Sequence, residues 1–187
     1  MEENVLYKTE YREVVKLLNE ELKARIQTLR NTMKEQLLDA YLVVSEHDIW
    51  YYTNITYKPE ERPFFLIIDL VSDIPQLLVP KLEESHVKKG ILPFQVISYW
   101  DYPATDTTTW HSLLNETISK YSSVGIESTI PLHFYEQITH PTLVPTNLVE
   151  LQRKIKSPYE VAKIKAVFVN FVAFVTVCYL TIGQIVE

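Results

Sequence analysis

Residues 40–44 read Ala-Tyr-Leu-Val-Val, and they mark a change of pattern that decides the fold. Before them, in residues 7–37, apolar side chains recur every three or four positions, which predicts one long amphipathic helix or two consecutive ones. The stretch itself is short, apolar and rich in strand-forming residues, so it predicts a buried strand. The chain therefore passes from helix to strand at about residue 40.

Strands and helices alternate farther along the chain. Apolar runs predict strands at residues 64–68, 76–79, 95–99, 123–127 and 143–144. Helices are expected at 49–52 (with Asp48 as N-cap), 81–89, from Trp110 to Ile118, and 132–138. This alternation predicts an α/β fold with a mixed sheet flanked by helices.

A second stretch, KIKSPYEVAKIKAVF at residues 154–168, predicts a further helix. Ser157 suits the N-cap, Pro158 suits the first helical position, and Glu160 stands where a side chain bonds back to the cap. This capping box predicts a C-terminal helix that starts at residue 158.

Composition excludes several classes of function. A net charge of −6 argues against a general nucleic-acid binder, which needs a basic face. The three glycines are not clustered, so no phosphate-cradling loop is expected. Cys178 is the single cysteine, which leaves no disulfide and no cysteine-based zinc site. The N-terminus lacks a secretory pattern, so we expect a cytoplasmic location.

Few residues suggest catalysis. His47 and Asp48 are adjacent and favour a simple turn over an acid/base pair, because neighbouring side chains point apart in most backbones. His133 and His140 are seven residues apart, but Pro141 and the lack of a third ligand argue against a metal site. Cys178 lies in an apolar run, which favours a buried, inert thiol.

Two aromatic clusters, Trp50-Tyr51-Tyr52 and Trp100-Asp101-Tyr102, have two interpretations. Core and sheet-edge packing is the simpler one. The other is a surface on which a partner subunit or substrate docks, since exposed Trp and Tyr favour interfaces.

The apolar tail is a third feature. Residues 166–186 contain no charged side chain, and about 20 such residues could span a bilayer. The same run fits a helix buried inside a larger domain, and Asn170, Thr176 and the β-branched residues favour that interpretation. We expect this tail to self-associate or to dock.

The pattern from Arg153 to Ala166, Arg-x-Ile-Lys-Ser-Pro-x-Glu, resembles the interdomain junction of the pita-bread metallopeptidase family: Xaa-Pro aminopeptidases, prolidases and creatinase. Four other segments resemble parts of the same N-terminal domain in the same order: Arg25 to Met33 with residues 38–44, residues 48–54, residues 61–68, and residues 124–127. Asn54 departs from the pattern, which usually has glycine there, but asparagine tolerates left-handed backbone angles.

The resemblance implies a creatinase/prolidase-like N-terminal α/β domain at residues 1–153. Residues 154–187 would be the junction and first helix of a truncated catalytic domain. In the family, two divalent metal ions such as Mn, Co or Zn are held by two Asp, one His and two Glu of the catalytic domain. No position here matches those ligands, so no catalytic, cofactor-binding or metal-binding residue is assigned. A homodimer, contact with its own catalytic domain and proline-containing peptide substrates for the complete enzyme are implied as well.

Three hypotheses follow. The leading one is a non-catalytic N-terminal domain of a Xaa-Pro-type metallopeptidase, with a role in dimerisation and in shaping access to the active site. The second is a stand-alone binding or assembly module whose apolar tail contacts a partner or a membrane. The third is an unrelated α/β enzyme that uses Asp69 and Asp73, or Glu83 and Glu84, although their expected exposed turns give no reason for shifted pKa values.

Overall fold

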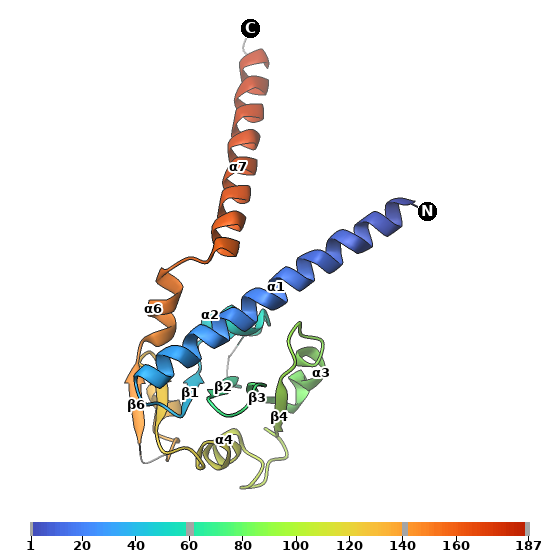
Figure 1. The fold of residues 1–187 in the computed structure, drawn as a ribbon. Coiled ribbons are helices and arrows are strands. Elements are labelled where there is room, and N and C mark those ends of the chain that lie inside the picture. The colour runs from blue at the N-terminus through green and yellow to red at the C-terminus, as the bar shows by residue number, and fades with distance from the viewer. Residues whose placement is uncertain (1, 59–61, 140–141, 186–187) are drawn as a thin grey trace. The chain divides into compact units, whose positions relative to one another are not determined.

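The computed structural model describes the backbone of residues 2–58, 62–139 and 142–185 (Figure 1). Side chains are described for residues 11–58, 62–139, 142–172 and 174. The chain divides into two compact units, Met1–Gln152 and Arg153–Glu187. The first unit holds a sheet with its covering helices, and the second is mainly one long helix.

The sheet has six strands in the order β4-β3-β2-β1-β5-β6. Their bounds are β1 Ala40–Val43, β2 Phe65–Asp69, β3 Gln76–Pro80, β4 Gln95–Tyr99, β5 Val124–Glu127 and β6 Leu143–Thr146. Strand β2 pairs antiparallel with both β1 and β3, whereas β1 with β5, β3 with β4, and β5 with β6 pair parallel. The prediction of a mixed α/β sheet is confirmed.

The first unit contains seven helical segments in the described part of the chain. They are α1 Glu2–Glu35, α2 Glu46–Thr53, the 3-10 turn η1 Lys81–Glu83, α3 Glu84–Val87, α4 Trp110–Ile118, α5 Leu132–Tyr135 and α6 Leu148–Lys154, whose last residues belong to the second unit. The region of residues 7–37 forms one helix rather than two, because α1 is continuous to Glu35. The sequence patterns did not predict α6.

Each face of the sheet has its own hydrophobic core. Successive residues of a strand contribute to one core and then the other, because their side chains point to opposite faces of the sheet. On one face, Tyr41 and Val43 pack with residues of α1, α2 and α6. On the other face, Leu42 and Phe65 pack with α4 and with Phe134 of α5. Figure 1 shows α1 and α4 on opposite sides of the sheet. The strands β1, β2 and β5 are therefore buried on both faces.

The start of α2 differs from the expectation. Asp48 is not the N-cap, because the helix begins at Glu46 and Ser45 occupies the cap position without a side-chain cap bond. The amide of Ser45 donates instead to the carboxylate of Glu127, a residue 82 positions away in the sequence. A carboxyl group far away in the sequence thus accepts from the amide at the start of α2, which no local pattern could reveal.

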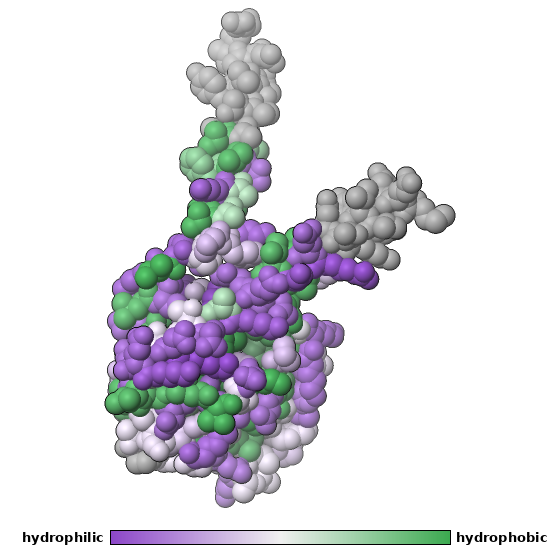
Figure 2. All heavy atoms as spheres, in the orientation of Figure 1, coloured by the Kyte–Doolittle hydropathy of each residue, from purple (hydrophilic) through white to green (hydrophobic). Residues whose placement is uncertain are grey.

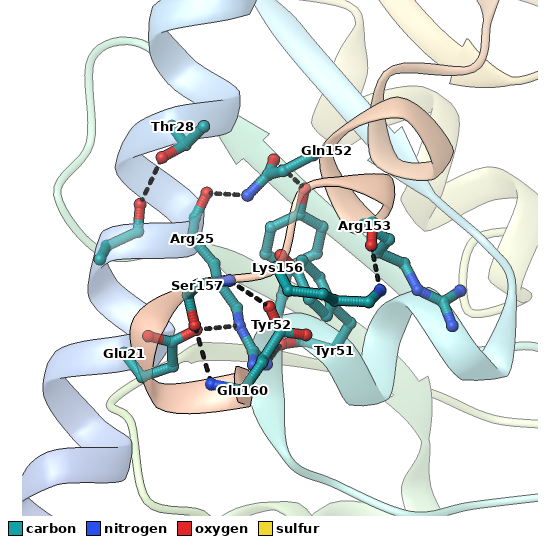
Figure 3. A network of polar contacts seen from close by, with 11 residues as sticks. Glu21, Arg25, Thr28, Tyr51, Tyr52, Gln152, Arg153, Lys156, Ser157 and Glu160 are labelled. Atoms are coloured by element: carbon teal, nitrogen blue, oxygen red, sulfur yellow. Dashed lines mark hydrogen bonds and ion pairs between the residues drawn. The ribbon is translucent and has the colours of Figure 1, made fainter. Parts of the chain in front are cut away.

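A buried arginine joins α1 to α2 (Figure 3). The guanidinium of Arg25 forms an ion pair with Glu21 at 2.9 Å, donates to the carbonyl of Tyr51 at 2.7 Å and lies 4.1 Å from the centre of the Tyr51 ring. The amide of Gln152 donates to the Arg25 carbonyl at 3.0 Å and accepts from the Tyr52 hydroxyl at 2.9 Å. These bonds join α2 and α6 to α1.

The second unit contains helix α7, Pro158–Ile185, and its predicted capping box is present (Figure 3). The amide of Glu160 donates to Ser157 Oγ at 3.1 Å, and the amide of Ser157 donates to the Glu160 carboxylate at 3.0 Å. Apolar side chains are exposed along its described part, among them Ile164, Phe168 and Phe171 (Figure 2). A membrane-spanning helix is not found among the described residues.

The contact of Gly125 with Tyr41 gives a stability prediction. These residues are paired in the β1–β5 register, and a Cβ on Gly125 would lie 2.6 Å from Tyr41 Cδ2 and 2.8 Å from Leu38 Cδ1. Both neighbours are buried, so neither can turn out into solvent to make room. Gly125→Ala should lower the free energy of unfolding by about 2 kcal/mol, measured by urea denaturation.

Gly90→Ala is the matched control for this prediction. Its added Cβ would lie 3.1 Å from the Val87 carbonyl oxygen and 3.4 Å from Ile55, so a smaller loss is expected. Neither glycine has a positive φ, so backbone strain does not separate the two variants. Equal stability of Gly125→Ala and the unaltered protein would contradict the packing argument.

Candidate functional site

The connections that follow most of the strands begin at one edge of the sheet. Strands β1, β3, β4, β5 and β6 run in the same direction and end at this edge, and the antiparallel strand β2 begins there. We call it the carboxyl edge. In open α/β sheets, ligands bind beyond the carboxyl ends of the strands. The carboxyl edge is therefore the place to look for a functional site.

The connection from β1 to β2 forms much of this edge. It begins and ends there, and it consists of α2 followed by a loop. Asn54 ends the helix in the left-handed conformation, with φ of 57°, and its amide donates to the Trp50 carbonyl at 2.7 Å. This geometry accounts for asparagine at a position where the related pattern has glycine, because asparagine adopts positive φ more readily than most residues.

Two neighbouring hollows lie along this connection and share Tyr57 and Lys58. The larger, of about 520 Å³, is lined by Glu46, His47, Trp50, Thr56, Tyr57 and Lys58. The smaller, of about 350 Å³, is lined by Tyr57, Lys58, Arg62, Phe64, Pro80, Leu82 and Glu83. Tyr57 is held between them by stacking on Phe64, with ring centres 3.9 Å apart. Both hollows are open, and their linings mix aromatic rings with charges of both signs.

In the structure, both aromatic clusters lie at the carboxyl edge. Some of their side chains are buried and others are exposed. Tyr51 and Tyr52 are buried in the core, whereas Trp50 is 47% exposed. At the end of β4, Trp100 is 46% exposed and Tyr102 is 91% exposed. The core interpretation therefore holds for two tyrosines, and three aromatic side chains remain available to a partner.

Polar contacts tie the cluster after β4 to the segment that precedes β2. Arg62 forms an ion pair with Asp101 at 2.9 Å. The hydroxyl of Tyr99, the last residue of β4, donates to the Pro63 carbonyl at 3.0 Å. The segment before β2 and the segment after β4 are thus joined across the intervening strand β3.

A buried carboxyl group lies at the same edge. Glu127 ends β5 and is 4% exposed, and its Oε2 atom accepts from the amides of Val44 at 2.8 Å and Ser45 at 2.7 Å. The pKa of Glu127 is raised to about 8, mainly by burial and in addition by a hydrogen bond with Asp48 and by the negative charge of Asp48. The two backbone amides oppose this rise, since they favour the charged form.

The other residues considered from the sequence do not assemble into a reactive site. His47 is exposed and lies 3.9 Å from Glu46, whereas Asp48 is buried, so the adjacent pair is not an acid/base pair. His133 is exposed on α5 and lines a hollow of about 330 Å³ beside Glu127. His140 and the side chain of Cys178 lie outside the described residues.

The expectation of an exposed turn was wrong for Asp69, and the expectation of an unshifted pKa was wrong for Glu84. Asp69 is buried, because the Tyr121 hydroxyl donates to it at 2.5 Å and the amides of Val71 and Ser72 donate to its other oxygen. Glu84 bonds to Lys81 and Lys88, and these contacts lower its pKa to about 2. A carboxyl group with so low a pKa is a poor proton donor or acceptor at neutral pH.

The sheet is open and mixed, has helices on both faces, and has α2 and a loop at its carboxyl edge. These features place the chain in the class of open-sheet α/β domains. In the sequence, residues 25–156 match the family model of the creatinase/prolidase N-terminal domain. The chain therefore belongs to the creatinase/prolidase N-terminal domain family. The match begins inside α1, so the first two-thirds of that helix precede the matched region.

Solved structures show the same fold. One is the creatinase/prolidase N-terminal domain of an X-Pro dipeptidase from Streptococcus pyogenes, with 17% identity and a TM-score of 0.60 over 71% of this chain and 99% of that chain. Another is a proline dipeptidase from Streptococcus pneumoniae, with 23% identity and a TM-score of 0.60 over 70% of this chain and 98% of that chain.

A longer structure is similar over part of its length. The prolidase from Pyrococcus horikoshii has 19% identity and a TM-score of 0.58 over 74% of this chain, but only 37% of that chain is covered. No curated protein matches this chain.

The family resemblance implies two metal ions held by a catalytic domain. Among the described residues, no three or more His, Cys, Asp or Glu side chains are grouped so that they could hold a metal ion. The described residues of this chain therefore do not fit the implied two-metal centre.

The raised pKa of Glu127 predicts a pH-dependent stability. An unfolded glutamic acid titrates near 4.5, so between about pH 4.5 and 8 the folded state holds a proton that the unfolded state has lost. The stabilising contribution is complete below pH 4.5 and disappears as the pH rises through about 8. The free energy of unfolding should fall by about 5 kcal/mol across this interval, and Glu127→Gln should remove most of the fall.

Urea unfolding at a series of pH values measures this effect. Glu116→Gln, on the exposed side of α4, is the control and should leave the pH dependence unchanged. A Glu127→Gln variant with the same pH dependence as the unaltered protein would show that Glu127 does not bind the extra proton.

Proposed function

We propose that this chain is the N-terminal, non-catalytic domain of a Xaa-Pro-type metallopeptidase, an aminopeptidase or dipeptidase that cleaves next to proline. The observation that carries the proposal is the family match over residues 25–156 together with the shared fold. In such an enzyme, two divalent metal ions in the catalytic domain would activate water and polarise the peptide carbonyl. The role of this domain would be architectural.

The architectural role that we propose is dimerisation and the shaping of access to a neighbouring active site. The carboxyl edge supports this role, because Trp50, Trp100 and Tyr102 are exposed there beside two open hollows. Large aromatic side chains contribute much of the binding energy at protein interfaces. The partners would be the domain's own catalytic domain and a second copy, and the substrates of the enzyme would be proline-containing peptides.

A second candidate is a stand-alone binding or assembly module. The observation that favours it is α7, on which apolar residues are exposed on all sides of the described part, including Val167, Phe168 and Val169 in succession. A helix that is apolar all round is stable when another structure covers it. In the first candidate, that cover would be the catalytic domain that α7 opens.

The purified 187-residue protein should not hydrolyse proline-containing dipeptides or tripeptides when Mn²⁺, Co²⁺ or Zn²⁺ is added, because its described residues offer no metal ligands in a group. A full-length prolidase assayed in parallel is the control. Metal-dependent cleavage by this protein alone would contradict the non-catalytic role.

The reading frame beyond the codon for Glu187 separates the two candidates. Under the first, it encodes two Asp, one His and two Glu in that order. Under the second, it does not.

The carboxyl edge also predicts a change in self-association. If a second copy docks there, replacing both Trp50 and Trp100 with serine should weaken dimerisation at least about tenfold in sedimentation equilibrium. The matched control is Val71→Ser, which changes a 91% exposed apolar residue beyond the end of β2, at the opposite edge of the sheet. An equal effect of the control, or none from the tryptophan pair, would place the dimer contact elsewhere.

A further inference from the structure

Strand β4 is the last strand at one end of the sheet, so one of its sides pairs with no other strand of the described chain (Figure 1). On its paired side, the amide of Gln95 donates to the Pro75 carbonyl at 3.0 Å, so the backbone of Gln95 faces β3. Successive residues of a strand turn their backbone groups to alternate sides. The amides and carbonyls of Val96 and Ser98 therefore face outward, and these amides make no backbone bond to another described segment.

The loop after β4 limits how much of this outer side is accessible. The amide of Trp100, which faces the same way, donates to the Thr108 carbonyl at 2.9 Å, so the side is occupied from Trp100 onward. Helices α3 and α4 both contact β4, and they contribute to the cores on opposite faces of the sheet. What β4 offers to a partner is thus the outward backbone of residues 94–98, which we call the free side of β4.

The opposite end of the sheet is protected in a way that β4 is not. On β6, the Thr146 carbonyl accepts from the amide of Ser128 at 2.9 Å, so Thr146 faces inward and Pro145, next to it, faces outward. Proline has no N–H, and proteins use proline or charged side chains to keep exposed strands from pairing. Residues 94–100 contain neither a proline nor a charged side chain. The free side of β4 therefore remains available for pairing.

A second copy of this chain fits the free side better than a foreign peptide does. Domains that add a peptide strand to a sheet select it through pockets for its alternate side chains. None of the three hollows described above includes a residue of β4. A second β4 placed antiparallel brings the start of one strand beside the end of the other. The exposed Lys89 before β4 and the exposed Asp106 after it then come to the same end of the pair with opposite charges.

We propose that two copies of this domain join their sheets through antiparallel pairing of β4, with Val96 opposite the partner's Val96 on the two-fold axis. This register sets Ser98 opposite the partner's Phe94, so the partner's strand, which begins at Gln95, does not reach Thr108. The half-buried side chain of Val96, which packs against the core on the α1 side, is covered by its copy. The inference rests on the dimerisation proposed above and names the element that makes the contact.

Val96→Pro tests this pairing in sedimentation equilibrium of the full 187-residue chain. The substitution removes the outward amide but no bond to β3, so the sheet should keep its strands. Dimerisation should weaken at least about tenfold, because hydrogen bonds across the two-fold axis are lost. Val96→Ala is the matched control, since it shortens the same side chain but keeps the amide, and its loss should be much smaller. Equal losses in the two variants, or no loss in Val96→Pro, would overturn the pairing.

Disulfide cross-linking tests the register without a proline in the sheet. In a chain that carries Cys178→Ser, Val96→Cys should give a disulfide-linked dimer under mild oxidation. Directly paired residues of antiparallel strands have Cα atoms about 5.5 Å apart, which a disulfide can bridge. Ser98→Cys is the control, because its two copies lie about 14 Å apart along the paired strands and should stay unlinked. Linkage of Ser98→Cys in place of Val96→Cys would show that the proposed register is wrong.

The outcomes separate this inference from the dimerisation on which it rests. A dimer that Val96→Pro does not weaken and Val96→Cys does not link would keep dimerisation but exclude β4 as the contact. An unaltered protein that stays monomeric at every concentration would exclude dimerisation itself.

Discussion

The direction of β2 is the constraint on which the functional surface depends. Because β2 runs against its neighbours, the connection from β1 to β2 leaves and rejoins the sheet at the same edge. A parallel β2 would need a crossover to the opposite edge, and α2 would then have to run the length of the sheet. Instead, the eight residues of α2 and the loop after them stay at the carboxyl edge. The hollows around Tyr57 and the exposure of Trp50 are consequences of that return.

Glu127 takes a place that an outside ligand takes in many α/β proteins. The amides at the junction of the first strand with the following helix often bind a phosphate, because the N-terminus of a helix favours an anion. Here the amides of Val44 and Ser45 are bound by a carboxylate of the same chain. This agrees with the lack of clustered glycines in the sequence, since a backbone that receives a side chain need not admit a phosphate group. A side chain of the domain itself, rather than a ligand, thus accepts from the amides before α2.

Much of the fold could be predicted from local patterns, and the failures share one cause. The strands follow from short apolar runs, and α7 begins where Ser157, Pro158 and Glu160 predict, because those signals act over three residues. Asp48 was wrongly expected to cap α2 because the group that serves the helix start comes from β5. Asp69 was wrongly expected in an exposed turn because Tyr121, 52 residues later, covers it. The aromatic clusters were recognised individually, but their meeting at one edge depends on the direction of β2, which the patterns do not reveal.

The capping box of α7 has a consequence for whatever that helix contacts. The bonds between Ser157 and Glu160 fix the backbone of the first turn of α7, and with it the angle at which the side chains of the helix begin. At 100° per residue, that starting angle determines the direction of each later side chain, including those of Ile164, Phe168 and Phe171. The capping box therefore determines in which directions the apolar side chains of α7 point, whatever surface the helix contacts.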